Sequence, residues 1–265
     1  MYLKYWGFKD PPFENVPNRK LFFRSDQHEE AVVRLMYAVK NLKGAALLTG
    51  DVGFGKTTIS RVLEKRLSKD QYNFSRIFNP ALEPVDFIKS ILIKLGENAD
   101  NDSKTILINK LHDRLSVNAS NGINTVLIID EAHLIPSRET FEELRMLLNM
   151  QSEYQFLITL ILMGQLPLIE LIEEQRSLKE RISIKYHLES LSLKDTARYI
   201  LFRLKNVGSK KGFFSKQAVL AIHNYSQGIP LRINNLCDRS LLLGMINNVS
   251  VINSSIIETA IEDIR

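Results

Sequence analysis

The sequence predicts an α/β protein whose parallel five-stranded sheet is sandwiched by helices and is followed by a small all-helical domain. Two observations lead to this fold class. Up to about residue 190, short apolar segments alternate with amphipathic helical segments, as in a parallel sheet covered on both faces. After Leu191, helical spacing continues without an evident strand. A chain of 265 residues is long enough for an α/β domain with a small companion.

The individual elements follow from local patterns. Strands are expected at residues 45–49, 72–78, 125–129, 157–163 and 182–188, and the run at residues 125–129 is the clearest buried one. Amphipathic spacing predicts helices at residues 27–40, 85–95, 105–115 and 139–148, and one that follows the glycine-rich segment beginning at Gly50. Further helices are expected at residues 193–205, 216–225, 231–245 and 254–264.

These patterns divide the chain into three parts. Residues 1–24 are predicted to form an arm that is rich in aromatic residues and prolines, and therefore too apolar for a solvated tail. Residues 25–190 are predicted to form the α/β domain, and residues 191–265 the helical domain.

The composition limits the kind of protein. The single cysteine, Cys237, excludes an internal disulfide framework and a cysteine-rich zinc site, and it suits a reducing compartment such as a cytosol. No uninterrupted apolar stretch of the sequence has membrane-spanning length. The net charge of +5 and a pI of about 9.2 permit contact with nucleic acid or an anionic membrane surface without requiring either.

A glycine-rich segment after the first expected strand has the pattern of a phosphate-binding loop. It comprises Gly50, Asp51, Val52, Gly53, Phe54, Gly55, Lys56, Thr57 and Thr58. The glycines let several backbone N–H groups point at one phosphate, and the dipole of the following helix adds to the attraction. We expect Lys56 to reach the β- and γ-phosphates of ATP, and the Thr57 hydroxyl to bind Mg²⁺. The alternative is a glycine-rich turn that contains Lys-Thr by chance, and the strand–loop–helix context argues against it.

Two acidic residues, Asp130 and Glu131, follow the apolar strand expected at residues 125–129. Ligands of open α/β sheets lie beyond the carboxyl ends of the strands. We therefore expect Asp130 to hold Mg²⁺ through water, and Glu131 to activate a water molecule for attack on the γ-phosphate. The alternative is that both are solvated turn formers at a strand end. A base next to the magnesium ligand favours an ATPase over a small GTPase.

With these motifs the sequence resembles the AAA+ branch of the P-loop NTPases. Within that branch it is similar to the bacterial ATPases of the general secretion pathway protein A type and to their relatives in type IV pilus biogenesis. The similar segments are residues 5–13 (YWGFKDPPF), 48–58 (LTGDVGFGKTT), 128–133 (IIDEAH), 162–167 (LMGQLP) and 228–234 (GIPLRIN). The resemblance covers nearly the whole chain, although Phe54 stands where a threonine or serine is more usual.

The resemblance implies two further residues that contact the γ-phosphate. Gln165 would be the polar sensor at the end of the fourth strand, and Arg232 the arginine of a helical lid formed by residues 191–265. The family's Pro-Arg pair is interrupted here by Leu231, which shifts the arginine by one position. The alternatives are an ordinary loop glutamine and a solvated arginine at a helix start. His133 is interpreted either as a residue near the nucleotide or as a structural one.

The resemblance also implies that neighbouring copies share their active sites. Arg181 stands where related ATPases carry an arginine finger, which reaches the nucleotide of a neighbouring subunit. Arg176 is the rival, and a surface salt bridge is the alternative for both. In the arm at residues 1–24, the aromatic residues Tyr5, Phe8 and Phe13 are expected either to help wall the adenine or to pack the arm onto the core.

The expected function is magnesium-dependent ATP hydrolysis that supports the assembly of a bacterial secretion or pilus machine. A homo-oligomer, an envelope or membrane protein partner, and a cytoplasmic location that is peripheral at the inner membrane through that partner are part of this expectation. The alternative is a DNA-binding transposition accessory ATPase, because such proteins share this core and the pI suits DNA. A third hypothesis, left open by Phe54, is a nucleotide-gated scaffold with negligible turnover.

Overall fold

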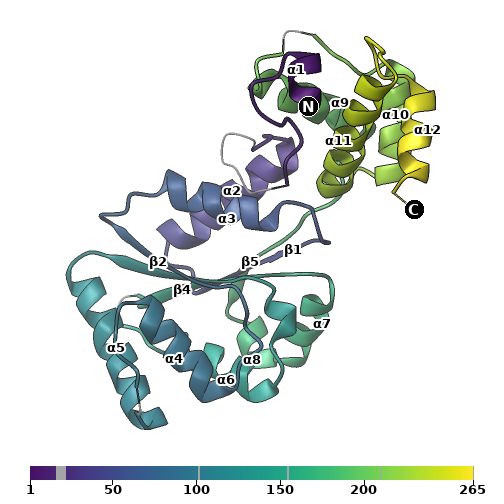
Figure 1. Cartoon of the computed structure of the whole chain (residues 1–265). Helices are drawn as coiled ribbons and strands as arrows, with labels where there is room; N and C mark the ends of the chain where they lie inside the picture. The colour runs from purple at the N-terminus through teal and green to yellow at the C-terminus, as the bar shows by residue number, and fades with distance from the viewer. Residues whose placement is uncertain (16–21, 101, 154, 210, 265) are drawn as a thin grey trace. The chain divides into compact units, whose positions relative to one another are not determined.

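The computed structural model describes residues 1–15, 22–100, 102–153, 155–209 and 211–264, so that residues 16–21 of the predicted arm lie outside it. Its backbone contacts divide the chain into two compact units (Figure 1). The sheet unit comprises residues 26–51 and 59–188, and the helical unit comprises residues 1–25, 52–58 and 189–265. Among the described residues, no helix is long and apolar enough to cross a membrane.

A five-stranded sheet of parallel strands forms the centre of the sheet unit. Its strands are β1 (Ala45–Thr49), β2 (Tyr72–Ile77), β3 (Asn124–Ile129), β4 (Ile158–Gly164) and β5 (Ile182–His187). Their order is β2-β3-β4-β1-β5, so β4 separates β1 from β3, while β2 lies at the edge. Every residue of β1 and β4 is buried. The sheet and the helices on it confirm the predicted fold class.

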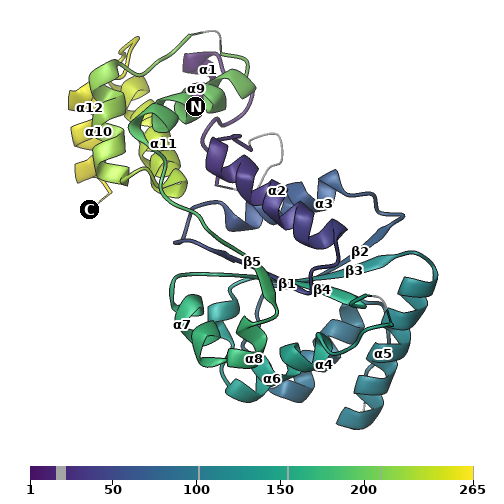
Figure 2. The same ribbon diagram turned by 180° about the vertical axis from the view of Figure 1, so that it is seen from behind.

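Helices cover both faces of this sheet (Figures 1 and 2). On one face lie α2 (Asp26–Lys40) and α3 (Lys56–Arg66). The other face carries α4 (Pro84–Lys94), α5 (Lys104–Ser120), α6 (Arg138–Leu147), α7 (Pro167–Glu174) and α8 (Arg176–Lys179). The sequence patterns did not indicate α7 and α8, because helices of eight and four residues are too short for helical periodicity to stand out.

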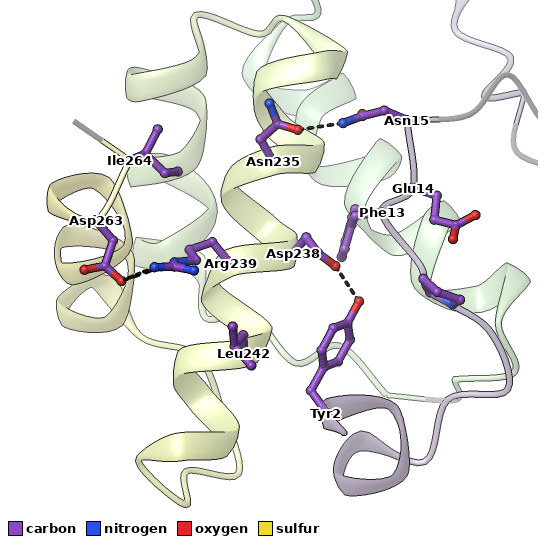
Figure 3. A pocket seen from close by; sticks show the side chains of 11 residues that line it. Tyr2, Phe13, Glu14, Asn15, Asn235, Asp238, Arg239, Leu242, Asp263 and Ile264 are labelled. Carbon is purple, nitrogen blue, oxygen red and sulfur yellow. Dashed lines mark hydrogen bonds and ion pairs between the residues drawn. The ribbon is translucent and has the colours of Figure 1, made fainter.

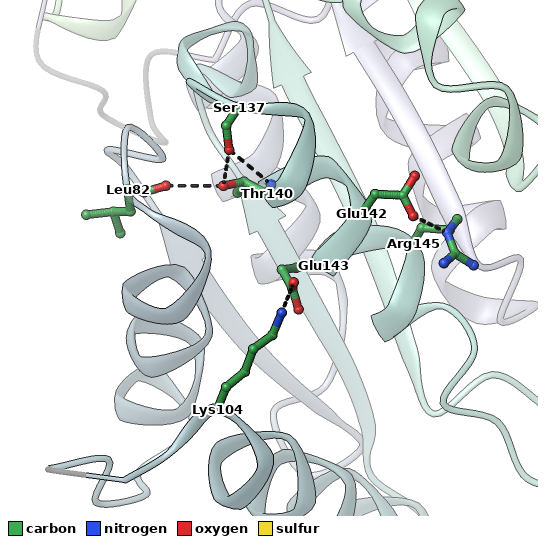
Figure 4. Close-up of polar contacts among 7 residues, drawn as sticks. All are labelled: Leu82, Lys104, Ser137, Thr140, Glu142, Glu143 and Arg145. Atoms are coloured by element: carbon green, nitrogen blue, oxygen red, sulfur yellow. Dashed lines mark hydrogen bonds and ion pairs between the residues drawn. The ribbon is translucent and has the colours of Figure 1, made fainter.

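Polar contacts fix the start of α6, which follows the loop after β3 (Figure 4). Ser137 caps the helix by accepting a hydrogen bond from the Thr140 backbone N–H at 3.2 Å. The Thr140 hydroxyl donates to the carbonyl of Leu82, ahead of α4, at 3.3 Å. Lys104, at the start of α5, pairs at 2.5 Å with Glu143, whose side chain is only 6% exposed. The helices on this face therefore hold the end of the loop that begins at β3.

The helical unit contains the four helices that the sequence predicts after residue 190. They are α9 (Leu193–Asn206), α10 (Lys216–Ser226), α11 (Pro230–Ile246) and α12 (Ser254–Glu262). Three of them begin with a side-chain cap, at Ser192, Ser215 and Asn253, whereas α11 begins with a proline. The arm also contains a five-residue helix, α1 (Tyr2–Trp6), which the sequence patterns did not indicate.

The arm packs on α11 around a cavity of about 670 Å³ (Figure 3). Tyr2 donates a hydrogen bond to Asp238, and Asn15 donates to Asn235 at 2.6 Å. The Trp6 indole N–H donates to the carbonyl of Leu241 at 2.9 Å. These contacts hold residues 1–15 of the arm against the helices of the helical unit.

The three aromatic residues considered for the adenine differ in burial. Phe8 and Phe13 are buried in the hydrophobic core of the helical unit, which supports a packing role for both. Tyr5 is 40% exposed, and its hydroxyl donates to the carbonyl of Val249. A role of these rings at the adenine stays a prediction.

One buried cation joins the arm to α9. Arg203 is 4% exposed, and its guanidinium donates to the carbonyl oxygens of Pro12 and Glu14, both at 2.6 Å. A third hydrogen bond, of 2.9 Å, reaches the hydroxyl of Tyr199. The backbone of the arm thus supplies acceptors that a buried guanidinium requires.

Candidate functional site

The carboxyl ends of β1, β3 and β4 meet at one edge of the sheet, as parallel strands require. Gly50, Asp130 and Gln165 are the residues that directly follow these strands. The Gly50 N–H donates to the carbonyl of Gly164, the last residue of β4, at 3.2 Å. This edge therefore gathers the start of the predicted phosphate loop, the acidic pair and the predicted sensor.

The glycine-rich loop leads from β1 into α3, whose first residue is Lys56. Gly53 and Gly55 have φ angles of 84° and 94°, in the left-handed region that favours glycine. A Cβ atom on Gly53 would lie 2.5 Å from the Cβ of Leu231, so glycine is also needed there for space. Lys56 is buried, with 5% of its surface exposed. The strand–loop–helix context that the sequence predicted is present.

Phe54, the unusual residue of the loop, is 6% exposed. Its ring is therefore part of the protein interior rather than of the solvent-accessible surface of the loop. Thr57 and Thr58 are half-buried in the first turn of α3, and Asp51 and Val52 are exposed. Related loops more usually carry a threonine or serine at this position. The larger aromatic ring of Phe54 is accommodated because it is buried.

The acidic pair forms a sharp turn after β3. Asp130 is 4% exposed and accepts a hydrogen bond from the Glu131 N–H through Oδ1, at 3.1 Å. Glu131 has a φ of 52° and a ψ of 40°, a left-handed conformation that costs a non-glycine residue about 1 kcal/mol. Its Oε2 atom is buried and accepts no hydrogen bond from any residue that the structure describes. Strain and an unpaired carboxylate oxygen are typical of functional positions.

His133 lies between Glu131 and Gln165. It belongs to the short 3₁₀ helix η2 (Ala132–Leu134), and its Nδ1 atom is 3.4 Å from Oε2 of Glu131. Its Nε2 atom is 3.0 Å from the side-chain Nε2 of Gln165, and the Gln165 backbone N–H donates to Nδ1 at 3.4 Å. Sequence reasoning noted His133 but missed this link, because Gln165 is 32 positions away along the chain. We see no signal in a single sequence that would have found it.

Arg181 lies at the amino ends of the strands, on the opposite side of the sheet from the acidic pair. It immediately precedes β5, and its carbonyl oxygen is 3.5 Å from the place where a Cβ of Gly44 would stand, just before β1. Its guanidinium donates to the side-chain oxygen of Asn149. A strand of this length separates the two edges by about 16–20 Å, at about 3.3 Å per residue. The structure therefore does not bring Arg181 to the acidic pair of the same chain.

The rival arginine, Arg176, belongs to α8 and is almost fully solvated. Its side chain is 90% exposed, and it pairs at 3.3 Å with Glu180, one helical turn away. Such an exposed pair contributes little to stability.

Arg232 occupies the first turn of α11 in the helical unit. Its side chain is exposed and makes no hydrogen bond or ion pair with any of the described residues. The preceding residue, Leu231, packs against Gly53 of the loop. The leucine that interrupts the Pro-Arg pair therefore has a packing role, and α11 begins beside loop residues 52–58.

The glycine-rich loop suits a bound phosphate group. Left-handed glycines and a buried lysine suit a phosphate group, which needs backbone N–H donors and positive charge. Within the described parts of the chain, no group of three or more His, Cys, Asp or Glu residues could hold a metal ion by itself. Mg²⁺ commonly takes few protein ligands and completes its shell with phosphate and water, so it does not require such a group.

Comparisons with known proteins agree with these observations. The AAA domain family matches residues 39–172. General secretion pathway protein A of Aeromonas hydrophila is 36% identical over 246 residues, which cover 91% of this chain and 44% of that protein. The chain thus spans less than half the length of this relative. The predicted resemblance to the general secretion pathway protein A type is confirmed.

Solved structures with the same fold include two ORC proteins. The Aeropyrum pernix ORC2 protein, in ADPNP and ADP complexes, has a TM-score of 0.72 at 17% identity, covering 97% of this chain and 72% of that chain. Drosophila ORC bound to DNA has a TM-score of 0.72 at 18% identity, covering 100% of this chain and 66% of that chain. At such identities the likeness concerns the fold alone.

Proposed function

We propose that this chain, which belongs to the AAA domain family, binds ATP with Mg²⁺ and hydrolyses it. The observation that carries the proposal is the carboxyl edge of the sheet. There a glycine-rich loop starts at the end of β1, and Glu131 presents a buried carboxylate oxygen without a hydrogen-bond donor among the described residues. A general base needs such a free oxygen to accept a proton from water.

Each residue of the edge has a role in this proposal. Loop residues 50–58 surround the phosphates with backbone N–H groups, and Lys56 donates to the β- and γ-phosphates. Thr57 and Asp130 would hold Mg²⁺, which would neutralise the charge that develops on the phosphate oxygens. Glu131 takes a proton from the attacking water.

Three residues act at the γ-phosphate in this proposal. Gln165 orients the γ-phosphate or the attacking water from the end of β4. Arg232 supplies positive charge from the first turn of α11, and Arg181 supplies it from a neighbouring copy. Without a neighbour, the site lacks this last charge.

Replacement of Lys56 by alanine tests the nucleotide site. We expect the affinity for a fluorescent ATP analogue with Mg²⁺ to fall by about 10- to 100-fold, because charge-assisted hydrogen bonds contribute about 1.5–3 kcal/mol. Lys65→Ala, at an exposed position in the last turn of the same helix, is the control and should bind as wild type does. Equal affinities of wild type and Lys56→Ala would contradict the proposed site.

The name of General secretion pathway protein A supports a role in secretion, and the proposed machine is a bacterial secretion or pilus machine. The proposed activity is then performed by a homo-oligomer on the cytoplasmic side of the inner membrane, held there by an envelope or membrane protein partner. Because this chain spans 44% of that relative, the partner and the machine belong to the proposal.

DNA binding is the competing function, and two observations favour it. The net charge is +5, and a protein of the same fold is bound to DNA in its solved structure. Binding of duplex DNA should therefore be measured with and without ATP at about 150 mM salt, where nonspecific binding is weak. We expect weak binding that ATP does not change. Tight binding that requires ATP would replace the secretion proposal by the DNA-associated one.

A further inference from the structure

We infer that His133 is a positioning residue that couples Gln165 to Glu131. Through the His133 ring, the orientation of the Gln165 side chain determines whether the Glu131 carboxylate accepts a hydrogen bond from the ring or is available to accept a proton from water. This inference rests on the proposed function, in which Glu131 is the base and Gln165 contacts the γ-phosphate. Nothing in the family resemblance assigned such a role to His133. It follows from the contacts of the imidazole ring.

The ring touches both residues through both of its nitrogen atoms. Nδ1 is 3.4 Å from Oε2 of Glu131, and Nε2 is 3.0 Å from the side-chain amide of Gln165. The His133 side chain is 12% exposed, so water competes little for these contacts. In a neutral imidazole ring, one nitrogen donates a hydrogen bond and the other accepts one.

Nδ1 faces two groups with opposite requirements. The backbone N–H of Gln165, at 3.4 Å, needs a lone pair, whereas the carboxylate of Glu131, also at 3.4 Å, needs a proton donor. The ring therefore satisfies one of them at a time. Oε2 of Glu131 is buried and accepts no hydrogen bond from the described residues. This agrees with the arrangement in which Nδ1 accepts from the backbone N–H of Gln165.

The side-chain amide of Gln165 is linked to this choice. When Nδ1 accepts from the Gln165 backbone, the ring proton is on Nε2 and requires the amide oxygen opposite it. The amide nitrogen lies 3.0 Å from Nε2 in the structure, so this arrangement needs the amide turned by half a turn, which exchanges its oxygen and nitrogen. When Nδ1 donates to Glu131, Nε2 accepts from the amide nitrogen instead. A half-turn of the amide, with the ring proton exchanged through water, thus accompanies the capture or release of the Glu131 carboxylate. A γ-phosphate that fixes the amide would fix the state of the base.

The surrounding backbone keeps the ring in place. Gly164 lies directly against it, because a Cβ atom there would be 3.2 Å from Nδ1 of His133 and 2.8 Å from a methyl group of Leu168. Glu131 and His133 belong to one tight turn, so neither can move far from the other. The ring can therefore change partners without leaving its position.

The test is a double-mutant cycle on wild-type protein, His133→Phe, Gln165→Leu and the double variant, with ATP turnover and ATP affinity measured for each. We expect His133→Phe to lower kcat by about 10-fold with KM for ATP within about 2-fold, because only the base is misplaced. In the Gln165→Leu background, His133→Phe should lower kcat by less than about 2-fold, since the link is already broken. His112→Phe, at a half-exposed histidine of α5, is the control and should leave turnover unchanged.

Conservative variants separate positioning from stability. His133→Asn retains a polar group near the position of Nδ1, and His133→Gln one near Nε2, so both should turn over ATP faster than His133→Phe. They also serve if the phenylalanine variant fails to fold. Independent losses from His133→Phe and Gln165→Leu, or an unchanged kcat in all three His133 variants, would overturn the inference. If wild-type protein itself lacks magnesium-dependent turnover, the proposed function fails instead.

Discussion

Replacement of Glu131 by glutamine should reduce ATP turnover by about 10²–10⁴-fold, the usual contribution of a general base, while ATP binding is retained. The amide has nearly the same shape as the carboxylate but cannot accept a proton from water. Oε2 accepts no hydrogen bond from the described residues, so the substitution removes none at that oxygen and alters only its 3.4 Å contact with Nδ1 of His133. The binding of a fluorescent ATP analogue and the release of phosphate are measured on the same preparation.

A nearby acid serves as the control for this variant. Glu139, in the first turn of α6, is exposed, and Glu139→Gln should turn over ATP as wild type does. If Glu131→Gln releases phosphate at the wild-type rate, Glu131 is not the base. Loss of ATP binding together with turnover would instead indicate a role of Glu131 in holding the nucleotide.

Replacement of Arg181 by alanine should lower turnover by about 10³–10⁵-fold if this residue is an arginine finger. The reason is that Arg181 lies at the amino end of β5, whereas the acidic pair lies at the carboxyl ends of the strands. The charge of Arg181 can therefore reach a phosphate only in another copy of the chain. Mixing Arg181→Ala with Glu131→Gln protein should restore part of the activity. A mixed pair then contains one site with the Glu131 of one copy and the Arg181 of the other.

Two variants separate this role from a structural one. Asn149→Ala removes the acceptor that Arg181 contacts within its own chain, and it should leave turnover nearly unchanged. Arg176→Ala, at the exposed rival position, should also be active. An inactive Arg176→Ala that is rescued in mixtures would transfer the finger to α8. Loss in Arg181→Ala without rescue by mixing would argue against a shared site.

The sheet could be predicted closely from the sequence, because β1, β3 and β4 are short apolar runs that are almost entirely buried. The strands β2 and β5 are only partly buried. The start of β1, for example, coincides with the predicted residue, and β5 differs from the prediction only at its end. The short helices α7 and α8 could not be predicted, since a helix of one or two turns has no clear period. The five residues of α1 escaped for the same reason.

The candidate site was predictable where its signal is local. The phosphate loop and the acidic pair are contiguous motifs, and their strands place them at one edge of the sheet. The link from Glu131 through His133 to Gln165 depends on β3 and β4 being neighbours, which the order of the chain does not reveal. Arg203 was missed because its acceptors are backbone carbonyls about 190 positions earlier in the chain.

The contacts of Arg203 have a practical consequence for protein engineering. The first residues of a domain usually tolerate trimming, because few buried groups depend on them. Here, removal of residues 1–15 would take away the two carbonyl acceptors of the Arg203 guanidinium, together with the core side chains of Trp6, Phe8 and Phe13. Loss of these buried aromatic rings and hydrogen bonds is strongly destabilising. The side chain of Met1, in contrast, is fully exposed, so an affinity tag or fluorescent fusion is better joined ahead of Met1 than in place of the arm.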